Sequence, residues 1–112
     1  MGLQEIVDSH ASLLFVARDS ERNNETVGTL TLVVFRTPTG CKAWIEDVVV
    51  DESARGKGVG EALSVAALKR AREEGAENVN LTSNPARKAA NLLYQKIGFV
   101  RRETNVYRYS IK

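Results

Sequence analysis

The feature that most constrains this chain is a valine-rich run that leads into a turn with three glycines, VVVDESARGKGVG at residues 48–60. Apolar residues at three consecutive positions predict the end of a central strand that is buried on both faces. The hydrophobic period then changes, and the apolar residues that recur at helical spacing are Val59, Leu63, Ala66 and Ala67. Because Gly75 supplies a C-terminal stop, we expect an amphipathic helix over residues 58–74 directly after the turn.

Further strand and helix patterns surround this segment. Strands are predicted at residues 13–17, 27–35, 42–50 and 78–82, followed by a strand pair over residues 99–111 that bends near Thr104 and Asn105. Asn84 followed by Pro85 predicts the start of a second helix, which ends at Gly98. The order β-β-β-α-β-α-β-β indicates an α+β fold that opens with an antiparallel meander. A length of 112 residues suits one domain, with residues 1–12 as a short arm.

Composition excludes several classes of protein. A net charge of +2 is too small to indicate nucleic-acid binding, which needs a clustered basic face. Cys41 is the only cysteine and His10 the only histidine, so we expect neither an internal disulfide nor a metal site. No apolar run approaches the roughly 18 residues of a membrane span, and Met1–His10 lacks the pattern of a signal peptide. These observations predict a cytoplasmic protein with no membrane partner.

The turn at residues 55–60 has the composition of an anion site. Backbone N–H groups at a helix start are unpaired, and glycines without a Cβ atom let a phosphate approach them. Arg55 and Lys57 add positive charge, so pyrophosphate is the expected ligand. A Walker loop is excluded because Gly58 follows the lysine, and a dinucleotide fingerprint fails because Glu61 stands where its third glycine is required.

The remaining pattern resembles that of the GNAT superfamily, which comprises acetyl-CoA-dependent N-acetyltransferases. Arg55, Gly58 and Gly60 match its motif A, Arg/Gln-x-x-Gly-x-Gly/Ala. The segment AANLLYQKIGF at residues 89–99 resembles motif B, with Tyr94 four residues before the Gly-Phe pair. The resemblance extends from Leu13 to the C-terminus and implies a mixed, mostly antiparallel, splayed sheet flanked by helices.

The resemblance also implies a reaction, in which a primary amine attacks the thioester of acetyl-CoA directly within a ternary complex. Acetyl-CoA would lie between the strand that ends at Val50 and the strand around Leu81, and Tyr94 would protonate the departing thiolate. The implied cofactor-binding residues are Val48, Val49, Val50, Arg55, Gly56, Lys57, Gly58, Val59, Gly60, Arg87 and Asn91. A catalytically weak acetyl-CoA-binding module of the same fold is the alternative function. A small RNA-binding domain is disfavoured because no basic strand carries interleaved aromatic residues.

Two departures from the family leave alternatives open. Arg87 stands where many relatives carry an asparagine seven positions before the motif B tyrosine, and the helices that usually precede the first strand have no counterpart in residues 1–12. We therefore expect a homodimer that covers the strand at residues 13–17, unless the N-terminal arm folds back over it.

The catalytic acid and base also have alternative interpretations. Relatives often place the general base where Glu46 stands, but an exposed or salt-bridged strand acid without a catalytic role is the alternative interpretation. Strict alternation would send Glu46 and Asp47 to opposite faces of the sheet. Tyr94 has an alternative role as a core-packing aromatic residue.

Overall fold

The computed structural model of this chain describes residues 10–112, so most of the expected N-terminal arm lies outside the described residues. The chain divides into two compact units, Met1–Thr82 and Ser83–Lys112. The expectation that the whole chain folds as a single domain stays a prediction.

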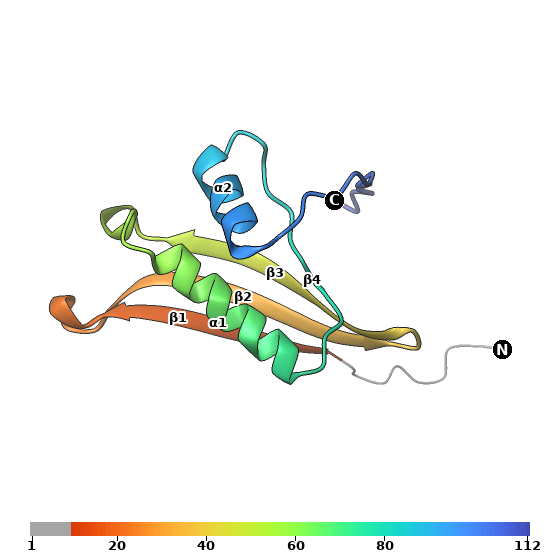
Figure 1. Cartoon of the computed structure of the whole chain (residues 1–112), viewed down its shortest axis with the longest axis horizontal. Coiled ribbons are helices and arrows are strands. Elements are labelled where there is room, and N and C mark those ends of the chain that lie inside the picture. The colour runs from red at the N-terminus through yellow and green to blue at the C-terminus, as the bar shows by residue number, and fades with distance from the viewer. Residues whose placement is uncertain (1–9) are drawn as a thin grey trace. The chain divides into compact units, whose positions relative to one another are not determined.

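The first unit is built on a four-stranded sheet with the order β1-β2-β3-β4 (Figure 1). β1 pairs with β2 and β2 with β3 in antiparallel fashion, whereas β4 is parallel to β3. The four strands are β1 (His10–Asp19), β2 (Glu25–Thr37), β3 (Gly40–Val50) and β4 (Val79–Asn80). The first four predicted strands are thus confirmed, the first three with longer bounds and β4 with shorter ones. The α+β class and the mixed, mostly antiparallel sheet are confirmed with them.

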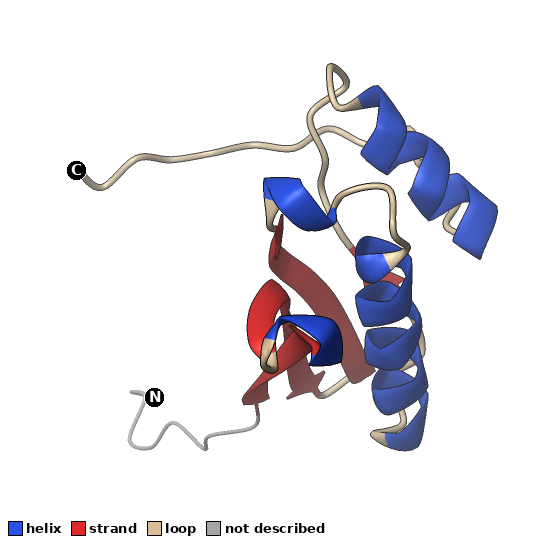
Figure 2. Ribbon diagram, turned by 90° about the vertical axis from the view of Figure 1, so that its left-hand side faces the viewer, coloured by secondary structure: helices blue, strands red, loops and turns tan. Residues whose placement is uncertain are grey.

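Helix α1 (Val59–Glu73) lies against one face of this sheet (Figures 1 and 2). Directly opposed residues of antiparallel strands share a face, so the register Leu13↔Leu32↔Ile45 places three apolar side chains in one row beneath the helix. The buried apolar residues that form this core are Val27, Leu30, Leu32, Val34, Ala43, Ile45, Ala54, Leu63, Ala67 and Ala71. Burial of this apolar row drives α1 onto the sheet.

The buried face of α1 differs from the predicted stripe at two positions. Ala66 is exposed, whereas Ser64 is buried and donates its hydroxyl to the Gly60 carbonyl at 2.8 Å. That bond satisfies the buried hydroxyl within the helix. The face that meets the sheet consists largely of small side chains, which brings the helix backbone close to the strands.

The end of β3 also differs from the prediction of a strand buried on both faces. Val49 is 60% exposed, and Val48 and Val50 are half-buried. The parallel ladder with β4 has only two residue pairs, Ala43↔Val79 and Trp44↔Asn80. Within residues 10–82, the end of β3 therefore has a strand neighbour only on the β2 side.

The second unit contains α2 (Lys88–Ile97), which begins three residues later than predicted. The Asn84 side chain accepts the Ala86 N–H at 2.8 Å and the Asn84 carbonyl accepts the Arg87 N–H at 2.9 Å, so these residues form a polar turn. Gly98, with φ of 124°, ends the helix as predicted.

The predicted strand pair over residues 99–111 is not formed, because residues 98–112 adopt no regular secondary structure. Phe99 is half-buried, and the other apolar side chains of this segment are exposed: Val100, Val106, Tyr107, Tyr109 and Ile111. Alternation alone does not form strands here. A two-stranded hairpin is marginally stable unless further strands or an apolar surface accept its side chains.

Candidate functional site

The segment between β3 and α1 is anchored at its start and free at its end. The Asp51 N–H donates to the Val27 carbonyl at 2.7 Å, which extends the contact between β2 and β3 by one residue. The single-turn 3-10 helix η2 (Glu52–Ala54) follows and inserts Ala54 into the core, where it is 2% exposed. Residues 51–53 and 55–58 are all exposed, so the buried side chain of Ala54 is the point at which this segment is held against the core.

Gly56 and Gly58 give the accessible part of the loop its shape. Both have φ of 80°, in the left-handed region that other residues adopt only with strain. A Cβ atom added at either position would meet nothing within 4 Å. The glycines are therefore required by backbone conformation, and they leave open space around a loop that also carries the exposed side chains of Arg55 and Lys57.

The start of α1 offers backbone donors to this open space. Gly58 is its N-cap and has no side chain with which to accept a hydrogen bond, although its carbonyl accepts the Ala62 N–H at 3.0 Å. The first N–H groups of a helix have no acceptor within the helix, and the helix dipole adds partial positive charge there. The amides of Val59 and Gly60 thus lie beside two cationic side chains, an arrangement suited to an anion.

Gly28 on β2 fixes where α1 begins, although it is not among the predicted site residues. A Cβ atom at this position would lie 2.7 Å from Val59 Cγ1 and 3.1 Å from Leu63 Cδ1. Only glycine lets the first turn of α1 pack this closely on the strand. An isolated glycine inside a β-branched run such as residues 27–35 is a recognised signal of close backbone approach and could have identified it.

A β-bulge interrupts β3 where the candidate base lies. The register passes from Thr31↔Glu46 to Thr29↔Val49, so two residues of β3 lie opposite one residue of β2. Asp47 adopts φ of 51°. The predicted strict alternation is therefore wrong at this point, and the side chains of Glu46 and Asp47 are both exposed.

The bulge borders an open strand edge. Beyond Trp44, β3 has no strand on its β4 side within residues 10–82. Backbone N–H and C=O groups along such an edge are available to an extended ligand, which can pair with them as a further strand would.

A hollow of about 400 Å³ lies beside the start of α1. Its lining includes Asp19 and Glu21 from the β1–β2 turn, and Lys57, Gly58 and Val59 from the loop and helix start. The hollow therefore borders the glycine loop and is lined by charged residues of both signs.

Three further candidate residues lie in the second unit. Tyr94 is 8% exposed, its ring meets the Phe99 ring edge-on at 5.8 Å between centroids, and its carbonyl accepts the Phe99 N–H at 2.9 Å. Arg87 is the exposed N-cap of α2, and the Asn91 amide nitrogen donates to the Asn84 carbonyl at 3.0 Å. Residues 46–60 all belong to the first unit. A role for Tyr94, Arg87 and Asn91 at the same site stays a prediction.

The described residues contain neither a membrane-spanning helix nor a cluster of metal-ligating side chains. No helix within residues 10–112 has the length and apolar character needed to cross a membrane. Over the same residues, no three side chains of His, Cys, Asp or Glu form a group that could hold a metal ion.

Comparison with known proteins gives matches of three kinds. The family model described as "Acetyltransferase (GNAT) family" matches residues 3–99. Mycothiol acetyltransferase of Paenarthrobacter aurescens (strain TC1) is 44% identical over 59 residues, which are 53% of this chain and 18% of that protein. A transcriptional regulator of Bacillus halodurans C-125 has a similar structure, with a TM-score of 0.76 and 31% identity over 88% of this chain and 66% of that one.

An acetyltransferase of Trypanosoma brucei has a structure about as similar to this chain as that of the transcriptional regulator. Its TM-score is 0.74 at 30% identity, over 88% of this chain and 69% of that chain. The chain thus spans about two thirds of these solved chains and only 18% of the curated relative's length.

Proposed function

Because this chain belongs to the acetyltransferase (GNAT) family, we propose that it moves an acetyl group from acetyl-CoA to a primary amine within a ternary complex. Family membership supports acetyl transfer with acetyl-CoA as co-substrate. The observation that carries the proposal is the start of α1, where uncapped backbone amides follow two left-handed glycines and lie beside Arg55 and Lys57.

The pyrophosphate of acetyl-CoA is assigned to this loop. The amides of Val59 and Gly60 donate to its oxygens, the glycines at 56 and 58 keep the approach clear, and the two cationic side chains offset its negative charge. Binding in this way needs no metal ion, because donors and positive charge are supplied by the chain itself.

The pantetheine arm is assigned to the open edge of β3. Its amide groups pair with backbone groups between Val48 and Val50, as a short added strand would. Arg87 and Asn91 are proposed as further cofactor contacts from the second unit. The exposed position of Arg87 at the start of α2 is compatible with a contact to a phosphate.

The chemical step needs a base, a polarised carbonyl and an acid. The amine loses a proton to Glu46, either directly or through water, and its nitrogen attacks the thioester carbon to give a tetrahedral intermediate. The carbon–sulfur bond then breaks, and the thiolate takes a proton from the Tyr94 hydroxyl. The tyrosinate takes the second proton that the nitrogen releases as the amide forms. The products are an N-acetylated amine and CoA. The position of Glu46 on β3, next to the open strand edge assigned to the pantetheine arm, supports its assignment as the base.

Two measurements on the purified chain test this function. Calorimetry determines whether CoA binds, and acetyl transfer to a panel of primary amines determines whether the bound thioester reacts. Binding with transfer supports the enzyme, and binding without transfer to any amine supports the alternative, a binding module of the same fold. Absence of CoA binding would refute both.

A homodimer is proposed from the edge strand β1. Within residues 10–112 β1 pairs with β2 alone, and its side chains Leu14 and Val16 are 66% and 40% exposed. Apolar edge strands of this kind are normally paired or covered. Light scattering at micromolar concentration tests the proposal, and a monomer mass of 12.3 kDa would contradict it.

A further inference from the structure

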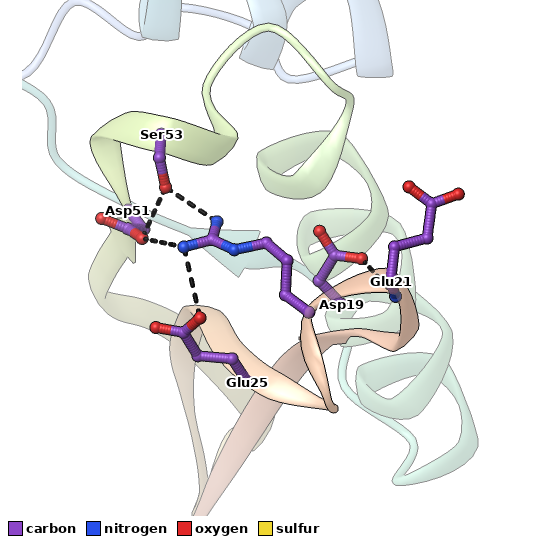
Figure 3. A network of polar contacts seen from close by, with 6 residues as sticks. Asp19, Glu21, Glu25, Asp51 and Ser53 are labelled. Carbon is purple, nitrogen blue, oxygen red and sulfur yellow. Dashed lines mark hydrogen bonds and ion pairs between the residues drawn. The ribbon is translucent and has the colours of Figure 1, made fainter.

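A polar network connects the β1–β2 turn to the start of the glycine loop (Figure 3). Arg22 is its centre: Nη1 donates to the Ser53 hydroxyl at 2.8 Å, and Nη2 lies 3.2 Å from Glu25 Oε2 and 3.7 Å from Asp51 Oδ2. Ser53 in turn donates to Asp51 Oδ2 at 2.8 Å. One guanidinium group therefore contacts both Asp51 and Ser53, which precede the glycine loop in the sequence.

The turn that carries Arg22 has its own internal support. The Asp19 carboxylate accepts the Glu21 N–H at 2.9 Å, which caps the single-turn 3-10 helix η1 (Ser20–Arg22). Asn23 and Asn24 follow with φ of 56° and 57°, which turns the chain sharply into β2. The guanidinium is thus presented from a tight turn between two long, paired strands.

The loop has less support after Arg55, whose N–H donates to the Glu52 carbonyl at 3.2 Å. Residues 55–58 are exposed and contain two glycines, and glycine has more backbone freedom to lose than any other residue. A ligand that needs this loop in one conformation must supply the free energy to order it. Contacts that hold the loop before binding reduce that cost.

We propose that Arg22 is a positioning residue for the cofactor loop, one that fixes Asp51 and Ser53 so that residues 55–60 are held ready for the pyrophosphate. The inference rests on the proposed function for the identity of the ligand. Arg22 touches neither ligand nor reacting atoms in this scheme. Its effect depends on the planar, forked guanidinium, whose Nη1 contacts the hydroxyl while Nη2 faces the two carboxylates. A lysine ammonium carries all its donors on one nitrogen and does not reproduce this geometry.

The test compares Arg22→Gln and Arg22→Lys with a matched control, Arg36→Gln. Arg36 pairs with Glu74 at 3.8 Å, beyond the opposite end of α1. Both changes at Arg22 are expected to raise the Kd for CoA and the KM for acetyl-CoA by about threefold to tenfold, as expected for loss of a partly exposed ion-pair network. The value of kcat should stay within about twofold, because the reacting groups are untouched. The Arg36→Gln control should have the same Kd for CoA, KM for acetyl-CoA and kcat as wild type.

A second readout does not depend on catalysis. Amide hydrogen exchange at residues 52–60 of the ligand-free protein should accelerate in both Arg22 variants, with the β2–β3 ladder unchanged. The double variant with Ser53→Ala and Arg22→Gln should exchange no faster at residues 52–60 than Arg22→Gln alone, because the two residues act through one network.

The possible results separate the two proposals. Wild-type protein that binds no CoA overturns the proposed function, and this inference with it. Wild-type protein that binds CoA, together with unchanged affinity and loop exchange in Arg22→Gln, overturns only the inference. Wild-type behaviour of Arg22→Lys would show that charge alone suffices and would likewise overturn the proposed geometry. A fall in kcat at unchanged KM would contradict a positioning role in cofactor binding.

Discussion

Replacing Gly28 with alanine should displace the start of α1. The added methyl group would lie 2.7 Å from Val59 Cγ1 and 3.1 Å from Leu63 Cδ1, and real Cβ atoms do not approach carbon as closely as the first distance. Val59 cannot simply rotate away, because a β-branched side chain in a helix has one strongly preferred χ1 rotamer. Either Val59 leaves that rotamer or the first turn of α1 moves off the sheet.

The size of the effect follows from these contacts. An off-rotamer side chain costs about 0.5–1.5 kcal/mol, and overpacking a well-filled core costs about 1–3 kcal/mol. The contact at 3.1 Å needs only a small shift of Leu63, so the Val59 contact decides the outcome. We expect Gly28→Ala to lose about 1–3 kcal/mol of unfolding free energy. For a chain of this size, that lowers Tm by about 4–8 °C for each kcal/mol.

Urea unfolding followed by the fluorescence of Trp44, the single tryptophan, measures this loss. The control is a double-mutant cycle with Val59→Ala, which removes the two methyl groups of the valine and makes room for the new one. The Gly28→Ala and Val59→Ala double variant should recover most of the penalty, giving a favourable coupling of about 1 kcal/mol or more. Unchanged stability of Gly28→Ala, or additive losses in the cycle, would refute close packing at this point.

Three further changes have defined outcomes. Gly58→Val places a β-branched residue at φ of 80° beside the helix start and should abolish CoA binding in a folded protein; normal CoA affinity by calorimetry would contradict this. Tyr94→Phe removes only a hydroxyl, so turnover should fall by about 100–10,000-fold while CoA affinity barely changes, and unaltered turnover would exclude Tyr94 as the acid. Leu32→Ala empties a fully buried site and should cost about 2–5 kcal/mol in urea unfolding, whereas a loss below about 1 kcal/mol would mean that the site refills.

The elements of the first unit could be predicted because their signals are local. The β-branched runs, the helical spacing after residue 58 and the stop at Gly75 each lie within one stretch of sequence, and each corresponds to an observed element. The glycine loop was also visible, since Gly56 and Gly58 occur where the chain needs left-handed φ angles. Such features depend on neighbours in the sequence rather than on distant contacts.

The features that were missed or wrong depend on pairing between distant residues. The bulge at Asp47 exists only relative to β2, so alternation along β3 alone could not reveal it. Arg22 and Ser53 are 31 residues apart, and nothing in either local sequence indicates their contact. The alternating residues at 99–111 carried a strand signal, but no described strand pairs with them.

The difference between the two long antiparallel ladders and the two-pair β3–β4 ladder has a consequence for the order of folding. β1, β2 and β3 follow one another along the chain, so their hairpins close short loops, whereas β4 reaches β3 only after η2 and α1 have been made. Local contacts form faster than contacts between distant segments, and synthesis proceeds from the N-terminus. The meander can therefore assemble on the ribosome while its apolar row is still uncovered. Docking of α1 then buries that row. The same event fixes both ends of the glycine loop, which connects β3 to α1.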